Sequence, residues 1–166
     1  MNKRVVLGAV VSVLIVSGVA SGVVLYKEHQ NSNASAAANT PNAPAYATIL
    51  PSGKTIGQLG GWTLVSPSYA APVYAYADKI SGIGVTVSEQ QLPDSFKADP
   101  SGQLQKMATA YNATDQLQTG STRVYIGTSV NGPQSVIFIK NNLLILIKSE
   151  KAIDNKSWLH YVAALS

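Results

Sequence analysis

The stretch that decides the fold is SVIFIKNNLLILIK, residues 135–148. Two apolar runs rich in isoleucine and leucine are separated by Asn141 and Asn142, and asparagine tolerates the positive φ that a two-residue hairpin turn requires. The second run, 143–148, is apolar at successive positions, which is typical of a strand covered on both faces. We therefore predict a β-hairpin whose second strand lies in the centre of a sheet.

The chain before this hairpin supplies more strands. Residues 122–126 lead through Asn131 and Gly132 into the hairpin, which predicts a three-stranded meander with a second tight turn. Further back, residues 73–77 and 83–89 alternate apolar and polar side chains with period two. That alternation is typical of half-buried strands, so these segments are expected to extend an antiparallel sheet.

Two helices are expected to pack on the sheet. Asp99 is a good N-cap with Pro100 at the first helical position, and an apolar stripe follows at Leu104, Met107, Ala108 and Tyr111. Asp154 is the second N-cap, and its helix carries a stripe formed by Trp158, Tyr161, Val162 and Leu165, with His160 on the opposite side. The order strands, helix, meander, helix predicts the α+β class, with one mid-chain and one C-terminal helix packed on an antiparallel sheet.

A long run without charged side chains precedes these elements, at residues 5–26. As a helix rising about 1.5 Å per residue, it is long enough to cross the roughly 30 Å hydrocarbon core of a bilayer. Lys3 and Arg4 precede the run, whereas Lys27 and Glu28 cancel after it, so the positive-inside rule places the N-terminus in the cytoplasm. We expect a signal-anchor: a cytoplasmic tip at 1–4, a single transmembrane helix in the cell membrane, and an extracytoplasmic remainder.

A cleaved signal peptide is the competing interpretation of this run. Ala34, Ser35 and Ala36 resemble a cleavage site, but they lie well beyond the run, which exceeds the roughly 7–15 apolar residues of a signal peptide. A permanent anchor is therefore favoured. Inside it, small residues spaced four apart favour helix pairing and a homodimer; the two pairs are Gly8 with Ser12 and Gly18 with Gly22.

Composition divides the remainder into a flexible tether, 27–46, and one extracytoplasmic domain, 47–166. The tether is small, polar and nearly uncharged, which leaves little apolar surface to bury. The chain has no cysteine, which excludes a disulfide framework, thiol oxidoreductases and sortase-type transpeptidases. From residue 29 onward nine basic side chains stand against seven acidic ones without forming a stripe, so nucleic acid is not an expected partner.

No motif predicts a catalytic centre, a metal site or a cofactor. SGKT, residues 52–55, lacks the earlier glycine of a phosphate-binding loop, and residues 51–53 are interpreted as a hairpin turn. His29 and His160 lack acidic or cysteine partners at metal-ligand spacing. The carboxylates available for glycosidase chemistry are interpreted as turn and cap residues; they are Asp78, Glu89, Asp94, Asp99 and Asp115. A low-specificity envelope hydrolase with His160 as base remains an alternative.

Tyr69, Tyr74 and Tyr76 form the one candidate binding surface. Exposed aromatic rings can stack on a sugar or a peptide. Tyr74 and Tyr76 alternate onto one face of their strand, so the competing interpretation is a packed sheet face.

The extracytoplasmic part resembles a group of small domains of unknown function that follow a single transmembrane helix in bacterial surface proteins. The resemblance rests on a tyrosine-rich strand and the strand after it, 74–90, and on a late strand and tryptophan-containing terminal helix, 143–165. It implies a β-rich accessory domain of the bacterial cell envelope and supplies no catalytic residues.

The expected function is therefore a non-enzymatic domain, anchored in the bilayer, that binds a peptide, a partner protein or a wall component of the envelope. A pilin-like or pseudopilin-like structural subunit is the alternative, because pilins also join an apolar N-terminal helix to a sheet. The run 5–26 lacks the glutamate of a pilin helix, and the tether interrupts the helix before the domain.

Overall fold

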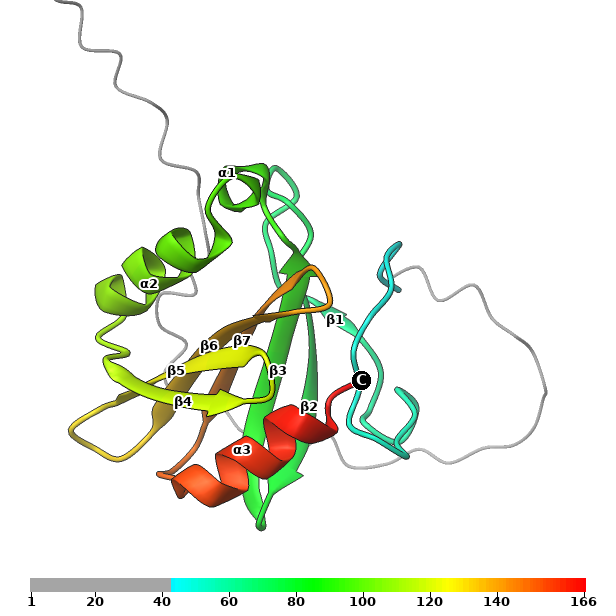
Figure 1. The fold of residues 1–166 in the computed structure, drawn as a ribbon. Coiled ribbons are helices and arrows are strands. Elements are labelled where there is room, and N and C mark those ends of the chain that lie inside the picture. The colour runs from blue at the N-terminus through cyan, green and yellow to red at the C-terminus, as the bar shows by residue number, and fades with distance from the viewer. Residues whose placement is uncertain (1–42) are drawn as a thin grey trace, which may run out of the picture. The chain divides into compact units, whose positions relative to one another are not determined.

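A computed structural model describes residues 43–166, which form a seven-stranded antiparallel sheet with the strand order β1-β2-β3-β7-β6-β5-β4 (Figure 1). The strands are β1 (Thr63–Leu64), β2 (Tyr74–Ile80), β3 (Ile83–Gln91), β4 (Asp115–Thr119), β5 (Thr122–Thr128), β6 (Gln134–Lys140) and β7 (Leu143–Ser149). The helices are α1 (Asp94–Lys97), α2 (Pro100–Ala110) and α3 (Asn155–Ala164). The expected α+β class is confirmed.

The predicted hairpin forms the middle of the sheet. Asn141 and Asn142 have φ of 50° and 59° and join β6 to β7 in a two-residue turn. β7 lies between β3 and β6, and every side chain from Leu143 to Ile147 is buried. The central position that the two-sided apolar pattern predicts is therefore confirmed.

Other connections differ from expectation. A tight turn lies at Asn131 and Gly132, as predicted, and the Gly132 N–H closes it on the Ser129 carbonyl at 2.9 Å. β5 pairs Thr128 with Gln134, so the loop 129–133 is longer than the two residues expected. β4 was not expected, because Leu117 is its one apolar side chain and the strand lies at an edge of the sheet. α1 adds a short third helix with Phe96 buried.

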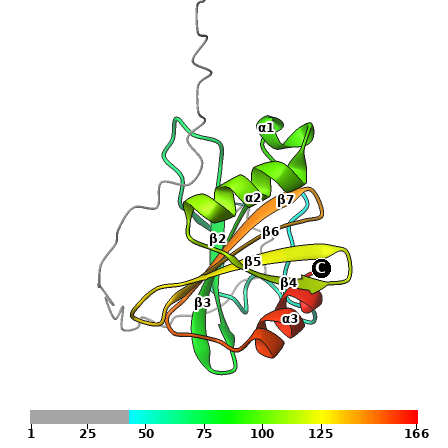
Figure 2. The same ribbon diagram turned by 60° about the vertical axis from the view of Figure 1, so that its left-hand side comes forward.

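The sheet has helices on both faces: α1 and α2 lie on one side and α3 on the other (Figures 1 and 2). α2 packs against β5 and β6, and α3 packs against β2 and β4. Both predicted N-caps are confirmed, since Asp99 accepts from the Gly102 N–H at 2.9 Å and Asp154 from the Ser157 N–H at 2.9 Å. In the α2 stripe, Leu104 and Ala108 are buried, whereas Tyr111 is 39% exposed.

The main core lies between α3 and the sheet. Trp158 is fully buried among side chains that include Phe138 and Ile145. Its indole N–H donates to Gln134 Oε1 at 2.8 Å, and the same oxygen accepts the Ile153 N–H at 2.8 Å. One buried amide on β6 therefore fixes both the start of α3 and its largest side chain.

Residues 46–61, here called the strap, also cross the α3 face. Leu50 and Ser166 exchange two backbone hydrogen bonds of 3.0 Å, and Ser52 donates to the Ala164 carbonyl at 2.8 Å. The strap is thereby fastened to the end of α3.

The predicted transmembrane run, 5–26, lies outside the described residues, and so do Gly8, Ser12, Gly18 and Gly22. Within residues 43–166, none of the helices is long and apolar enough to cross a membrane.

Replacing Gly127 with alanine is expected to lower the free energy of unfolding by about 1–3 kcal/mol. A Cβ atom there would lie 2.9 Å from the Asn112 carbonyl oxygen and 3.1 Å from the Ala113 Cα, and neither backbone atom can move aside as a side chain can. Equilibrium urea unfolding of residues 40–166 measures the change. Gly84→Ala is the matched control, because the atoms crowding that site belong to the movable Glu150 carboxyl group. Equal losses in both variants would contradict the explanation.

Candidate functional site

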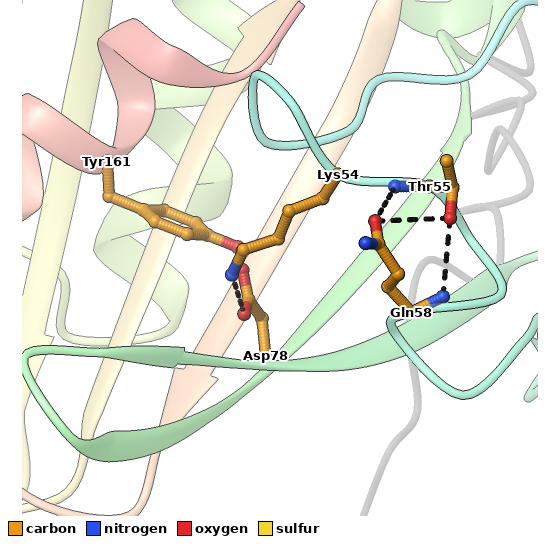
Figure 3. A network of polar contacts seen from close by, with 5 residues as sticks. All are labelled: Lys54, Thr55, Gln58, Asp78 and Tyr161. Atoms are coloured by element: carbon orange, nitrogen blue, oxygen red, sulfur yellow. Dashed lines mark hydrogen bonds and ion pairs between the residues drawn. The ribbon is translucent and has the colours of Figure 1, made fainter.

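A polar cluster joins three elements on the α3 face of β2. The Asp78 side chain on β2 is only 5% exposed. Its Oδ2 accepts the Tyr161 hydroxyl from α3 at 3.0 Å, and its Oδ1 forms an ion pair with the Lys54 ammonium group from the strap (Figure 3). Asp78 therefore serves neither a turn nor a cap, and that expectation is wrong.

The strap turn that carries Lys54 is held by its own hydrogen bonds. Gln58 Oε1 accepts the Thr55 N–H at 2.8 Å, and Thr55 Oγ1 accepts the Gln58 N–H at 3.4 Å (Figure 3). The Gly61 N–H closes the turn on the Ile56 carbonyl at 2.9 Å. A turn is present at 51–53, as expected, since Lys54 donates its N–H to the Pro51 carbonyl at 3.0 Å and Gly53 has φ of 78°. It is not the hairpin turn predicted, because the strands of the described residues begin at Thr63.

Tyr161 acts in this cluster as a hydrogen-bond donor. Burial raises the pKa of its phenol well above the usual value, and the neighbouring Tyr76 and Asp78 raise it further. The phenol therefore stays protonated at neutral pH. Asp78 on β2 accepts a hydrogen bond from α3 and forms an ion pair with a lysine of the strap. These two interactions hold α3 and the strap against β2.

Replacing Tyr161 with phenylalanine is expected to lower the free energy of unfolding by about 1–3 kcal/mol, because a nearly buried carboxylate oxygen loses its donor. Urea unfolding at pH 7 measures the loss. Tyr69→Phe removes a hydroxyl from a side chain that is 87% exposed and should change stability by less than about 0.5 kcal/mol. A Tyr161→Phe variant as stable as its Tyr69→Phe control would contradict the assigned role.

A hollow of about 570 Å³ lies beside this cluster. Its lining residues come from the strap and from β2: Lys54, Gln58, Leu59, Gly60, Ala77, Asp78 and Lys79. A second hollow of about 490 Å³ shares Lys79 and continues past the β2–β3 turn to α3, where His160 and Lys156 line it. Together they border the outer side of β2 and the start of α3.

The outer edge of β2 is unpaired where it meets the first hollow. β1 pairs with β2 only through Thr63 with Ala75 and Leu64 with Tyr74. Before Thr63 the chain turns away into the closed turn that ends at Gly61. Within residues 43–166, no strand pairs with the outer side of β2 beyond Ala75.

A buried acid lies at the centre of the same sheet face. Glu89 on β3 is fully buried, between Tyr74 on β2 and Ile145 on β7. Its Oε2 accepts the Ile49 N–H from the strap at 3.2 Å, whereas its buried Oε1 has no hydrogen-bond partner among the described residues. Burial raises the pKa of the Glu89 carboxyl to about 7, although the Ile49 hydrogen bond acts in the opposite direction.

The expectation that Glu89 serves a turn or a cap is also wrong. The period-two pattern of 83–89 already places it on the same side of its strand as Val85 and Val87. The same period-two alternation, continued to Glu89, therefore predicts that this acid lies on the buried face of its strand.

Aromatic side chains surround Glu89 and include two of the three predicted tyrosines. Ring centroids lie 6.3 Å apart between Trp62 and Tyr74, and 5.3 Å apart between Trp62 and Tyr76. The Tyr46 hydroxyl donates to the Glu89 carbonyl at 2.9 Å, and the Tyr76 hydroxyl donates to the Ile49 carbonyl at 3.3 Å. Tyr76 is buried in the core and Tyr69 stands in an exposed loop, so the three tyrosines do not all line one accessible surface.

Other candidate residues lie apart from this site. His160 is exposed on α3, as the helical pattern predicts. Asp94 pairs with Lys97 within α1, and this contact holds the pKa of the Asp94 carboxyl below its usual value. Among residues 43–166, no group of three or more histidine, cysteine or acidic side chains has the arrangement of a metal site.

Comparisons with known proteins found no matching family model, curated protein or solved structure.

Proposed function

We propose that the chain is a membrane-anchored extracytoplasmic domain of the bacterial cell envelope that binds another polypeptide. The anchor is the uncharged run 5–26, oriented by Lys3 and Arg4. The observation that carries the binding function is the unpaired edge of β2 beside an open hollow. Unpaired strand edges are established sites of polypeptide recognition.

The site favours binding over catalysis. Asp78 is held by Lys54 and Tyr161, and Asp99 and Asp154 cap helices. These acids have structural partners that fix their positions. A hydrolase based on His160 is the rival hypothesis, and a His160→Ala variant that loses a measured activity without losing its fold would support it.

Two measurements test the proposed location. In intact cells that produce the full chain with a C-terminal epitope, added protease should remove the epitope. The intact mass of the membrane-extracted protein should match residues 1–166, because an anchor is retained. A protected epitope would contradict the extracytoplasmic location, and a shortened N-terminus would favour the cleaved-signal or pilin-like alternatives.

A further inference from the structure

We propose that the outer edge of β2 binds an extended, acidic peptide segment, which pairs with Ala77 and Lys79 as an additional strand of the sheet. This inference rests on the proposed binding function and assigns it a surface and a class of partner.

The β2–β3 turn determines which backbone groups of β2 point outward. Ser81 and Gly82 form a two-residue turn, so Ile80 and Ile83 are its closing hydrogen-bonded pair. Pairs alternate along an antiparallel ladder, so Asp78 and Tyr76 also exchange hydrogen bonds with β3. The N–H and C=O groups of Ala77 and Lys79 therefore point away from β3, towards the outer edge.

The bond between Val65 and Val73 supports this assignment. The Val65 N–H donates to the Val73 carbonyl at 2.9 Å, so residue 73 faces β1. Alternation then makes residues 75, 77 and 79 face the same side. β1 covers Ala75 and leaves the next two positions uncovered.

The strap keeps this gap open. Gly60 and Gly61 have φ of 86° and 90°, values that turn the chain out of the extended conformation β1 would need to continue. The ion pair from Lys54 to Asp78 holds the strap on the α3 face. The edge is therefore preformed for a partner, which lowers the ordering cost of binding.

The charge of the lining favours an acidic partner. Lys54 and Lys79 stand at the first hollow against Asp78, and Lys156 stands at the second against Asp154. Asp78 is engaged by Lys54 and Tyr161, and Asp154 accepts from the Ser157 N–H and hydroxyl. Lys79 and Lys156 have no ion pair within residues 43–166, so they are available to a bound carboxylate.

An exposed lysine also discourages edge-to-edge aggregation, and this is the competing explanation for Lys79. This competing explanation predicts that no peptide binds to the outer edge of β2. β4 supplies the comparison, because it is the opposite edge strand and also leads into a two-residue turn.

The test uses the full chain in detergent micelles and the octapeptide Val-Thr-Val-Asp-Asp-Val-Thr-Val. Adjacent aspartates point to opposite faces of an added strand, so one of the two lies on the same face as Lys79. In the free protein, the amides of Ala77 and Lys79 should exchange with deuterium faster than those of Tyr76 and Asp78. Saturating peptide should slow exchange at Ala77 and Lys79 by about tenfold or more. The same peptide with two lysines in place of the aspartates should bind at least about tenfold more weakly.

Matched proline variants test the pairing itself. Ala77→Pro removes an outward N–H without removing a bond to β3, and should weaken peptide binding about tenfold or more. Gln116→Pro makes the same change at an outward position of β4 and should leave binding unchanged. Lys79→Glu should reverse the preference between the two peptides.

Unchanged exchange at Ala77 and Lys79 with saturating peptide would overturn the inference, even if a proline variant fails to fold. Equal binding of the two peptides would overturn its acidic specificity. Neither result bears on the protease and mass measurements, so the proposed extracytoplasmic location can stand even if this binding surface fails.

Discussion

Replacing Glu89 with glutamine is expected to raise the free energy of unfolding at pH 8 by about 1–3 kcal/mol. Glutamine keeps the acceptor for the Ile49 N–H and removes the charge from a side chain with no exposed surface. The increase in the free energy of unfolding is expected to be smaller than removal of the charge alone would give. The new amide N–H₂ group takes the place of the Glu89 Oε1 atom and, like it, has no hydrogen-bond partner among the described residues.

The pH dependence of the free energy of unfolding is a more specific test of the raised pKa of Glu89. Burial raises the pKa of folded Glu89 to about 7 from an ordinary value of 4.5. Between these pH values the folded state holds a proton that the unfolded chain has released, so stability falls as pH rises. Below about pH 4.5 the full stability is present, and above about pH 7 the loss is constant at no more than about 3 kcal/mol.

The measurement is urea unfolding of residues 40–166 at several pH values between 4 and 8, for the natural sequence and Glu89→Gln. Asp94 and Asp154 have lowered pKa values and favour folding as pH rises, but both proteins contain them, so the difference between the proteins isolates Glu89. Glu150→Gln removes an exposed carboxyl as a control. A difference that stays constant across this range would contradict a buried acid with a raised pKa.

Replacing Trp158 with alanine is expected to lower the free energy of unfolding by about 3–5 kcal/mol. The indole is fully buried in the main core, and its N–H is one of two donors to Gln134 Oε1. Truncation leaves a cavity and removes one of these hydrogen bonds. α3 should loosen, and with it the contact between Tyr161 and Asp78.

A second substitution at Trp158 separates the effect of lost side-chain volume from that of the lost hydrogen bond, and a substitution at His160 serves as the control. Trp158→Phe retains much of the apolar volume but lacks the donor, so an intermediate loss of about 1–3 kcal/mol is expected. His160→Ala changes an exposed neighbour on the same helix and should have little effect. Urea unfolding measures all three, and a Trp158→Ala loss below about 1 kcal/mol would contradict the assigned role of α3 docking.

The sequence predicts those parts of the fold whose signal is local. The two-sided apolar pattern of 143–148 places the central strand, and Asp99 and Asp154 mark the two longer helices. β4 escapes detection because an edge strand needs little apolar surface. The turn at Asn131 and Gly132 is present, but its loop is longer than two residues, because several loop lengths are compatible with the same residue pair.

The site depends on relations that no single segment contains. Lys54, Asp78 and Tyr161 come from a strap, a strand and a helix, so their contact follows only from the strand order and the path of the strap. The open edge of β2 likewise depends on where β1 stops pairing. Glu89 differs from these, because strict alternation in its own strand places it on the buried face.

Site-specific crosslinking in intact cells tests the central claim most directly. A photoreactive benzoylphenylalanine replaces the exposed Ala77 in one variant and Gln116 in the other, and the cells are irradiated before lysis. The proposed function predicts a crosslinked polypeptide of the cell envelope from position 77 and none from position 116. No crosslink from position 77, or a crosslink there to cytoplasmic protein, would contradict an extracytoplasmic binding domain that uses the edge of β2.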